Sequence, residues 1–353
     1  MKIKLSFSNF RLKRAWRFWL YFLPAIVSWA AESPEFISNR IKLEGVDPIW
    51  SDGYHNAFTT LAKWDNEYFC AFRHGPFHDM RFGCKGGEIF VIRSADLKKW
   101  DFAQSIKLPV KDPRDPQFFR FKNRLGLLIP CAGGKQWLDN YICWFDRTKP
   151  QPFAEQIRID IGNKRIWKII PNQDLLYASV HARPKDQWEV SLYESKDALE
   201  FEPKHTFNIN GKNIDGNEAD LLFLNNGQCV GVIRREKQPA ILVKSNFPYA
   251  AWLGSELNRE IHSPNLFQYK GEIFCACRIL DPAKMAILSI DLDKMKLHVE
   301  IILPSGGDCA QPGVLLEDDQ LLVSYYSQHD QPKKNENARA AAGIYLARLR
   351  LPK

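Results

Sequence analysis

Charged and phenolic side chains stand at the ends of apolar segments along this chain. In four segments, residues 61–73, 222–234, 266–278 and 314–326, the last residue follows the first apolar one by twelve positions. The residues at these ends are Arg73, Arg234 with Arg235, Arg278, and Tyr326 with Tyr325. Guanidinium groups bind carboxylates through paired hydrogen bonds. Apolar segments that repeatedly end in charge therefore favour a shared binding pocket over a solvated surface.

A second set of polar residues stands where the preceding apolar segments begin. Its members are His55, Asn56, Arg114, Asp115, Glu218, Asp220, His262, Asn265 and Asp308. In an antiparallel pair, the end of the second strand lies beside the start of the first, so both sets are expected on one face. Carboxylates in such a set could act as general acid and base.

Six repeats are expected to position these residues. They run over residues 46–103, 104–150, 151–203, 204–255, 256–302 and 303–351, with weaker copies of the apolar pattern at 119–131 and 167–183. A spacing of about 45–55 residues with turn signals in register is typical of a β-propeller. We predict an all-β, six-bladed propeller of four-stranded antiparallel blades, with one short helix at 337–342. Residues 37–43 are expected to supply the outer strand of the last blade and close the ring.

The first 31 residues differ from the rest. They carry six cations and no acidic residue, and residues 18–31 are largely apolar. A basic segment before a short apolar run indicates a secretory signal peptide or, if uncleaved, an N-terminal anchor. The apolar run is shorter than the roughly 20 residues of a membrane span. We therefore expect one domain over residues 32–353, in a periplasmic or extracellular protein that meets a membrane only if the segment stays attached.

Net charge and composition limit the classes of partner that we expect for this protein. The formal net charge of +8 falls to about +2 without the six N-terminal cations, so the basic balance gives no case for nucleic acid. The eight cysteines include no CxxC pair. His74 and His78 share a loop, but the spacing offers no third ligand, so we expect neither a metal site nor a cofactor. A monomer with a carbohydrate ligand is the expected form.

Two motifs resemble those of the sialidase superfamily. Ser94–Trp100 (SADLKKW) and Ser195–Phe201 (SKDALEF) are similar to its Asp box, S-x-D-x-G-x-x-W, without the glycine. The segment GNEADLLF at 216–223, followed by VIRRE at 232–236, is similar to the region in which sialidases carry a glutamate and, about 16 residues later, an arginine. The resemblance covers residues 46–351 and implies a propeller that hydrolyses glycosides at its axis.

The resemblance also implies roles. Tyr326, or else Tyr325, would be the nucleophile, Glu218 would remove its proton, and Arg234 and Arg278 would bind a substrate carboxylate. Asp79 would be the general acid. Geometry alone would equally admit Asp115 for that role.

One departure from the family pattern affects the expected ligand. Sialidases begin their first blade with an arginine, whereas residues 54–57 here read YHNA. Either Arg73 takes that place, or the ligand lacks a sialic-type carboxylate. Three functions stay open: an exported glycosidase acting on a terminal sugar, a non-catalytic glycan-binding propeller, and a polysaccharide lyase or glycosidase that uses a Glu/Asp pair, with Tyr326 as the base of the lyase.

Overall fold

The computed structural model describes residues 37–38, 40–80, 86–110, 112–132, 137–330 and 341–352. The expected signal segment and most of the expected helix lie outside these residues. Residues 341 and 342, at the end of that helix range, are not helical. Within the described ranges the one helical element is the 3-10 turn Pro184–Asp186, and no helix is long and apolar enough to span a membrane.

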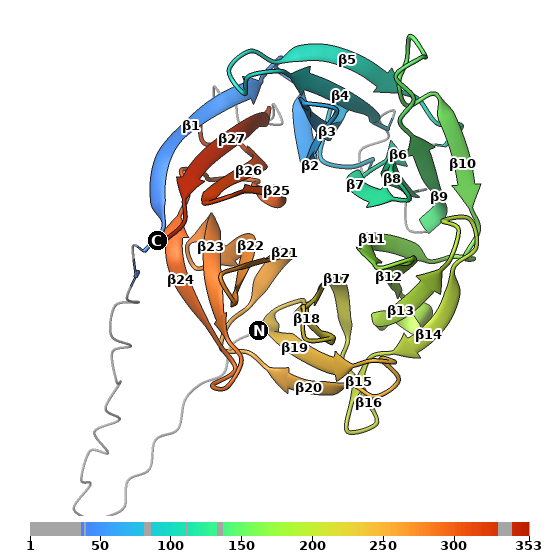
Figure 1. Ribbon diagram of the computed structural model, residues 1–353, viewed down its shortest axis with the longest axis vertical. Helices are drawn as coiled ribbons and strands as arrows, with labels where there is room; N and C mark the ends of the chain where they lie inside the picture. Colours follow the sequence, from blue (N-terminus) through green and yellow to red (C-terminus); the bar gives the residue numbers. More distant parts are fainter. Residues whose placement is uncertain are drawn as a thin grey trace, which may run out of the picture. The chain divides into compact units, whose positions relative to one another are not determined.

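Six antiparallel sheets form a closed ring, which confirms the predicted propeller (Figure 1). Blade 1 holds β2 (His55–Trp64), β3 (Glu67–Gly75), β4 (Glu88–Ser94) and β5 (Asp101–Ile106). Blade 2 holds β6 (Asp112–Pro113), β7 (Gln117–Phe121), β8 (Arg124–Ala132), β9 (Trp137–Trp144) and β10 (Glu155–Ile159). Blade 3 holds β11 (Arg165–Asn172), β12 (Leu175–Ala182), β13 (Glu189–Ser195) and β14 (Glu202–Thr206).

The remaining blades repeat this order from the centre outward. Blade 4 holds β17 (Gly216–Phe223), β18 (Gln228–Arg235), β19 (Gln238–Asn246) and β20 (Leu253–Glu256), after a small hairpin of β15 (Asn208–Ile209) and β16 (Lys212–Asn213). Blade 5 holds β21 (Ile261–Tyr269), β22 (Glu272–Leu280), β23 (Ala283–Asp291) and β24 (Lys296–Ile302). Blade 6 holds β25 (Ala310–Glu317), β26 (Gln320–Ser327), β27 (Gly343–Arg350) and β1 (Lys42–Trp50).

An N-terminal strand closes the ring, but at residues 42–50 rather than the expected 37–43. Strand β1 pairs with β27 from Lys42 opposite Arg350 to Trp50 opposite Ile344. Residues 46–50, which the repeat pattern assigned to the first blade, therefore belong to the last. The pattern misled because β1 is an outer strand with charged residues and Pro48, and such edge strands need little apolar sequence.

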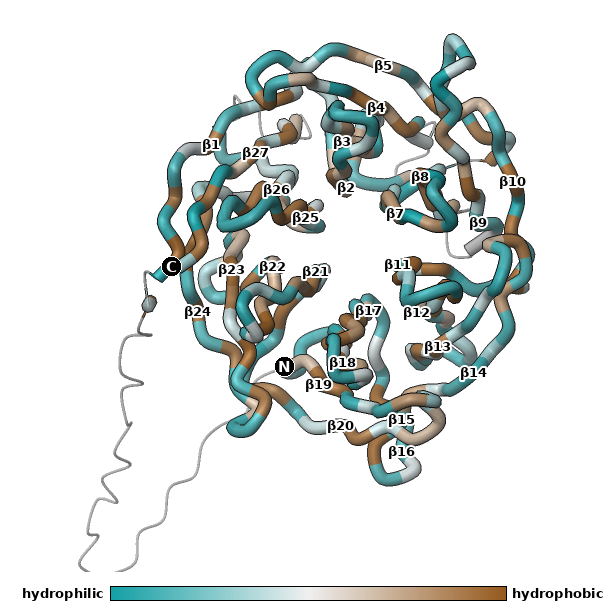
Figure 2. The backbone as a smooth tube through the Cα atoms, in the orientation of Figure 1, coloured by the Kyte–Doolittle hydropathy of each residue, from teal (hydrophilic) through white to brown (hydrophobic). Residues whose placement is uncertain are grey.

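The hydrophobic core is divided among the interfaces between neighbouring blades. Each of six buried clusters joins two adjacent sheets; one, for example, packs Cys70 and Phe72 of blade 1 against Leu322 and Tyr326 of blade 6. Figure 2 shows hydrophobic and hydrophilic residues interleaved along the strands, as expected for sheets that bury their faces against neighbours. The Ser–Asp pairs of the two Asp-box-like segments close turns: Asp96 accepts hydrogen bonds from two backbone amides at 2.9 and 3.0 Å, and Asp197 does so at 2.8 and 3.0 Å.

The innermost strands share an irregularity where they begin. Pairing shifts register between residues 57 and 60 in β2, 166 and 168 in β11, 216 and 219 in β17, 262 and 265 in β21, and 310 and 313 in β25, and in blade 2 the inner strand is broken between β6 and β7. Four residues at these points adopt a left-handed backbone: Phe58 (φ 62°), Asp115 (φ 46°), Ser263 (φ 51°) and Gln311 (φ 45°). Such conformations cost about 1–3 kcal/mol each in non-glycine residues and concentrate at functional sites. The bulges turn side chains at the strand starts out of the regular alternation.

Candidate active site

The face of the ring on which the inner strands begin and the second strands end is called the axial face here. Tyr326, at the end of β26, lies on this face and donates its hydroxyl to Asp308 Oδ1 at 3.0 Å. The Tyr326 side chain is almost fully buried, and its ring contacts Phe58 edge-on with 5.6 Å between centroids. Burial, with Asp308 nearby, raises the pKa of Tyr326 well above its usual value. The tyrosine that we expected to pair with Glu218 therefore pairs with an aspartate of its own blade.

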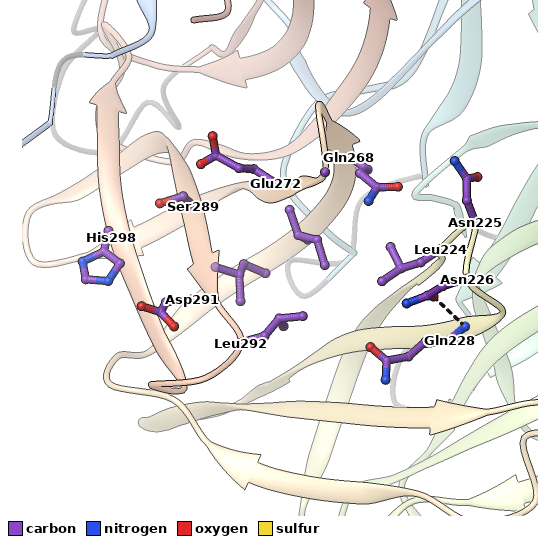
Figure 3. Close-up of a pocket in the computed structure, with 13 residues that line it drawn as sticks. Leu224, Asn225, Asn226, Gln228, Gln268, Glu272, Ser289, Asp291, Leu292 and His298 are labelled. Atoms are coloured by element: carbon purple, nitrogen blue, oxygen red, sulfur yellow. Dashed lines mark hydrogen bonds between the residues drawn. The ribbon is translucent and has the colours of Figure 1, made fainter.

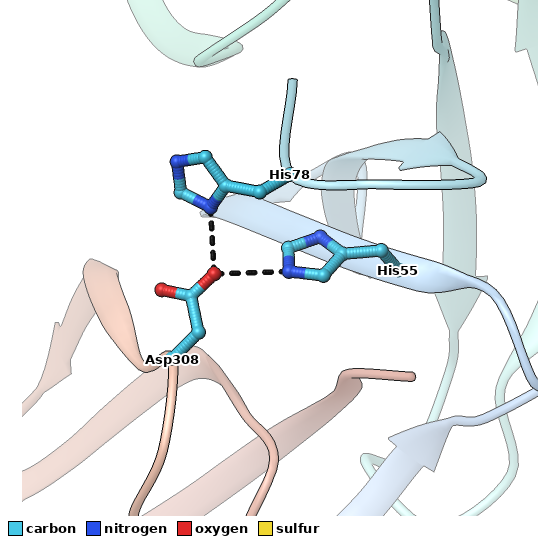
Figure 4. A group of neighbouring side chains, drawn as sticks. All are labelled: His55, His78 and Asp308. Atoms are coloured by element: carbon cyan, nitrogen blue, oxygen red, sulfur yellow. Dashed lines mark hydrogen bonds and ion pairs between the residues drawn. The ribbon is translucent and has the colours of Figure 1, made fainter. Parts of the chain in front are cut away.

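Two histidines bind the other oxygen of Asp308 (Figure 4). His55 Nε2 lies 2.9 Å from Oδ2, and His78 Nδ1 lies 2.6 Å from it. His55 begins β2, His78 lies in the loop after β3, and Asp308 precedes β25, so the group joins blades 1 and 6. Burial alone would raise the pKa of Asp308, but the hydrogen bonds from the two histidines outweigh it and lower that pKa.

Arg278 lies at the end of the second strand of blade 5. Its Nε is buried and has no hydrogen-bond partner among the described residues. Burial raises the pKa of Tyr326, and the positive charge of Arg278 partly opposes that rise. The two groups therefore interact electrostatically. A buried cationic donor without a partner is costly unless a ligand satisfies it.

Glu218 and Arg234 form an ion pair in blade 4. Arg234 Nη1 lies 2.5 Å from Glu218 Oε1, while the backbone amide and hydroxyl of Ser263 donate to Oε2 at 2.8 and 3.0 Å. Burial would raise the pKa of Glu218, but Arg234, His262 and Arg165 lower it to about 2. His262 lies on the same face, with Nε2 3.0 Å from Glu260. Glu218 is therefore an ionised carboxylate whose two oxygens are both bound.

Blades 2 and 3 contribute further charged residues. Asp115 and Arg165 form a buried ion pair, and Arg114 Nε lies 3.6 Å from Asp115. The Arg114 guanidinium also lies over the Phe58 ring, 4.6 Å from its centroid. Arg165 is also one of the charges that lower the pKa of Glu218, so blade 3 contributes to the electrostatics around that carboxylate.

Two expected binding residues are bound by protein groups, although the charge of Arg73 still acts on His55. Arg73 is 1% exposed, and its Nε donates to Asp112 at 2.8 Å and its Nη1 to the Phe77 carbonyl at 2.6 Å, so it supports the loop that carries His78. Arg235 donates to the Pro239 carbonyl at 2.8 Å on the opposite side of β18 from Arg234. Strand alternation explains this placement.

Three more expected residues hold the blades together. Asn56 is fully buried and donates to the Ala342 carbonyl at 3.1 Å. Lys168 joins blade 3 to Asp220 of blade 4 at 2.5 Å and to Asn265 of blade 5 at 2.9 Å, and Asn265 donates onward to the Pro312 carbonyl of blade 6 at 2.7 Å. Burial raises the pKa of Asp220.

The last two candidates are Tyr325, in blade 6, and Asp79, in the loop that carries His78. Tyr325 packs in the core between blades 5 and 6, and its hydroxyl donates to the Pro304 carbonyl at 2.6 Å, so it faces away from Tyr326. Asp79 is half-buried in the loop after β3, next to His78.

Arg165, Ser263 and Asp112 were missed by the sequence analysis. Arg165 begins β11 just as His55 begins β2, but the weak repeat in blade 3 hid its register. Ser263 and Gln311 each precede a proline at the bulge of their inner strand, as does Asp115 at the break in blade 2. This recurrence of a residue before proline was the available signal for the bulges.

A cleft of about 640 Å³ lies elsewhere, between blades 4 and 5 (Figure 3). Asn225 and Asn226 from the turn after β17, and Gly271 from the turn after β21, form part of its lining. These turns are at the opposite ends of the strands from Glu218 and Arg278. None of the expected site residues lines this cleft.

The ring is similar to solved sialidases. The phage phi92 endosialidase superposes with a TM-score of 0.66 at 10% identity, over 88% of this chain and 69% of that one. Trypanosoma rangeli sialidase gives 0.60 at 11% identity over 87% of this chain, and its complex with sialic acid gives 0.59 at 10% over 88%. The chain spans about 58% of the trypanosomal enzyme's length. No protein-family model and no curated protein matches the sequence. At this identity the likeness establishes the architecture: the chain has the six-bladed propeller fold of sialidases.

Proposed function

We propose that this protein is an exported glycoside hydrolase of sialidase-like type that releases a terminal acidic sugar at the axial face. The observation that carries the proposal is the Tyr326 hydroxyl, 3.0 Å from a carboxylate oxygen of Asp308 and close enough to Arg278 for that charge to act on it. A tyrosine nucleophile is the sialidase exception to glycosidases that use two carboxylates. The basic and then apolar residues 1–31 support export.

The proposed reaction uses Tyr326 as nucleophile and Asp308, in place of Glu218, as its proton acceptor. The tyrosine oxygen forms a bond to the anomeric carbon as its proton passes to Asp308, and the bond from that carbon to the leaving oxygen breaks. The leaving oxygen takes a proton from a general acid, for which Asp79 is the candidate beside His78. Water then cleaves the tyrosyl–sugar bond with the proton transfers reversed.

Glu218 is bound by groups other than Tyr326. Arg234 binds one of its oxygens and Ser263 the other, and no hydrogen bond joins Glu218 to Tyr326 among the described residues. We assign it to orienting Arg234 toward the ligand. This leaves Asp308 as the carboxylate that is bound to Tyr326 among the described residues.

Arg278 supports an acidic substrate. A buried guanidinium nitrogen without a protein partner is best satisfied by an anion, and a sugar carboxylate matches guanidinium geometry. Arg114, stacked on Phe58, adds a second cation on the same face. The position of the missing first-blade arginine is occupied by His55, so the carboxylate would be held by fewer arginines than in the resembling family.

One observation favours a second candidate, a glycan-binding propeller without turnover. Tyr326 is only 1% exposed, its pKa is raised, and the pKa of its partner Asp308 is lowered, so the proton transfer is uphill in this geometry. Before Tyr326 can react, substrate binding has to displace the His78 side chain or change the charges around Tyr326 and Asp308. A protein that never does so would bind a glycan only.

The experiment that separates the two candidates is a turnover screen of the purified protein. Aryl glycosides of sialic acid, of uronic acids and of neutral sugars are offered in parallel, and released phenol is measured. The proposal expects turnover of an acidic glycoside and little of its neutral counterpart. Binding of an acidic sugar without any release would support the binding module, and turnover confined to neutral glycosides would refute the assignment of Arg278.

A further inference from the structure

Three potential metal ligands converge at the junction of blades 1 and 6. His55 Nε2, His78 Nδ1 and Asp308 Oδ2 all lie within 4.8 Å of one another. Spacing along the chain indicates no third ligand for His78, because Asp308 stands 230 positions away and meets it only when the ring closes. We propose that these three residues bind a divalent transition-metal ion, with Zn²⁺ as the representative.

The donor set fits this class of metal. Imidazole nitrogens suit zinc, iron and nickel, whereas calcium and magnesium prefer sites built from oxygen. In the structure both histidines point their nitrogens at the same carboxylate oxygen, at 2.9 and 2.6 Å. A metal ion would replace the protons that these contacts share, and small side-chain shifts would bring all three atoms to ligand distance.

Neighbouring groups hold Asp308 and the loop that carries His78, as second-shell groups do in metal sites; the Nδ1 of His55 is buried and has no hydrogen-bond partner among the described residues. Asp308 is oriented by Tyr326 on its other oxygen and by its backbone amide, which donates to Gln328 Oε1 at 2.9 Å. His78 follows Phe77, whose carbonyl accepts a 2.6 Å hydrogen bond from Arg73.

The site is open on one side. The side chain of His55 is 5% exposed, but those of His78 and Asp308 are 38% and 25% exposed. Three protein ligands with an open position are typical of metal sites that also bind water or a ligand. The metal would use Asp308 Oδ2 and leave Oδ1 to Tyr326, so this site does not depend on the proposed hydrolase activity.

Metal binding is tested by calorimetric titration of chelator-treated, dialysed protein with Zn²⁺, Mg²⁺ and Ca²⁺ in separate runs. We expect one Zn²⁺ site per chain and no comparable site for Mg²⁺ or Ca²⁺. Loss of a second-shell partner alone weakens metal binding about 10–100-fold. His78→Ala, which removes a ligand, is therefore expected to weaken this site by at least about 100-fold.

The control variant is His329→Ala. His329 also pairs with an aspartate, Asp330, at 3.1 Å, but belongs to no group of three potential ligands among the described residues. It should bind Zn²⁺ as the wild type does. Because His78 is partly exposed, metal-free His78→Ala should melt near the wild-type temperature. Zn²⁺ should raise the melting temperature of the wild type and of His329→Ala, but not that of His78→Ala. No Zn²⁺ site in the wild type, or equal affinity in His78→Ala, would overturn the proposal whether or not the protein hydrolyses glycosides.

Discussion

Tyr326 and Asp308 share a 3.0 Å hydrogen bond at the point where the last blade meets the first. Asp308 reaches this position from the loop before β25, and its second oxygen binds two histidines of blade 1. The carboxylate thus connects the tyrosine of blade 6 with the start of β2. Any change that loosens the junction of these two blades should therefore disturb the proposed nucleophile as well as the fold.

Gly313→Ala tests how tightly this junction is packed. A Cβ at Gly313 would lie 2.5 Å from the Leu61 backbone nitrogen and 2.8 Å from the Thr60 backbone carbon, and backbone of a neighbouring blade cannot move aside easily. Overpacking of this kind typically costs about 1–3 kcal/mol. We expect a loss of unfolding free energy of that size in denaturant titrations.

Gly45→Ala serves as the control for that substitution. Its Cβ would meet only the end of the flexible Arg348 side chain, at 3.4 Å, in the outer strand of the same blade. It should stay within about 1 kcal/mol of the wild type, since replacing glycine at a compatible position changes stability by that amount or less. Equal destabilisation by both substitutions would contradict the tight junction.

Glu218→Gln should reduce stability in a pH-dependent way. The folded-state pKa of about 2 lies below the usual 4.5, so the carboxylate stabilises the fold fully above pH 4.5 and progressively less as pH falls toward 2. A shift of this size corresponds to about 3 kcal/mol at neutral pH. The difference between wild type and variant should therefore be largest near pH 7 and shrink below pH 4.5.

Thermal or denaturant unfolding at several pH values measures this difference. Glu155→Gln is the matched control, because Glu155 pairs with Arg124 at 2.8 Å but is 51% exposed. Exposed pairs contribute about 0–1 kcal/mol. A Glu218→Gln penalty that does not change between pH 7 and pH 3 would mean that Arg234 does not stabilise the ionised carboxylate.

The fold was predictable because the inner two strands of each blade are apolar, separated by turns and regularly spaced. The twelve-residue register located the ends of β3, β18, β22 and β26 within a residue or two. The closing strand was misplaced because β1 is an outer strand whose burial alternates weakly. Its sequence carries little of the apolar pattern on which the prediction depended.

The site was only partly predictable, for two physical reasons. Register shows which face a residue lies on, but not which residues of neighbouring blades meet, so the contact of His78 with Asp308 could not be foreseen. Bulges at the inner strand starts also break the two-residue alternation, which is how Phe58 and Ser263 come to contact site residues. Arg73 ends its strand in the expected register but is enclosed by Asp112 and the Phe77 carbonyl.

Arg278→Gln tests the expected ligand charge. Loss of a hydrogen bond to a charged group costs about 1.5–3 kcal/mol, which corresponds to roughly 10–150-fold in affinity. We expect binding of an acidic sugar to weaken by this factor, and binding of its neutral analogue to change little. Arg235→Gln is the control, since Arg235 binds the Pro239 carbonyl on the other side of the strand. Titration calorimetry with the two sugars decides, and equal effects of both substitutions would argue against Arg278 as the anion partner.

The central claim is that the Tyr326 hydroxyl, held by Asp308, is the nucleophile of a glycosidase. The most direct measurement compares turnover of an acidic aryl glycoside by Tyr326→Phe and by Tyr325→Phe, each of which removes one hydroxyl from adjacent residues of β26. Tyr325 donates to the Pro304 carbonyl away from the axial face, so its variant should keep activity near that of the wild type. Tyr326→Phe removes the nucleophile itself and should lose more than about 10²-fold in kcat, the smallest loss typical of removing a general acid or base, while still binding the sugar. Unchanged turnover by Tyr326→Phe would contradict the account.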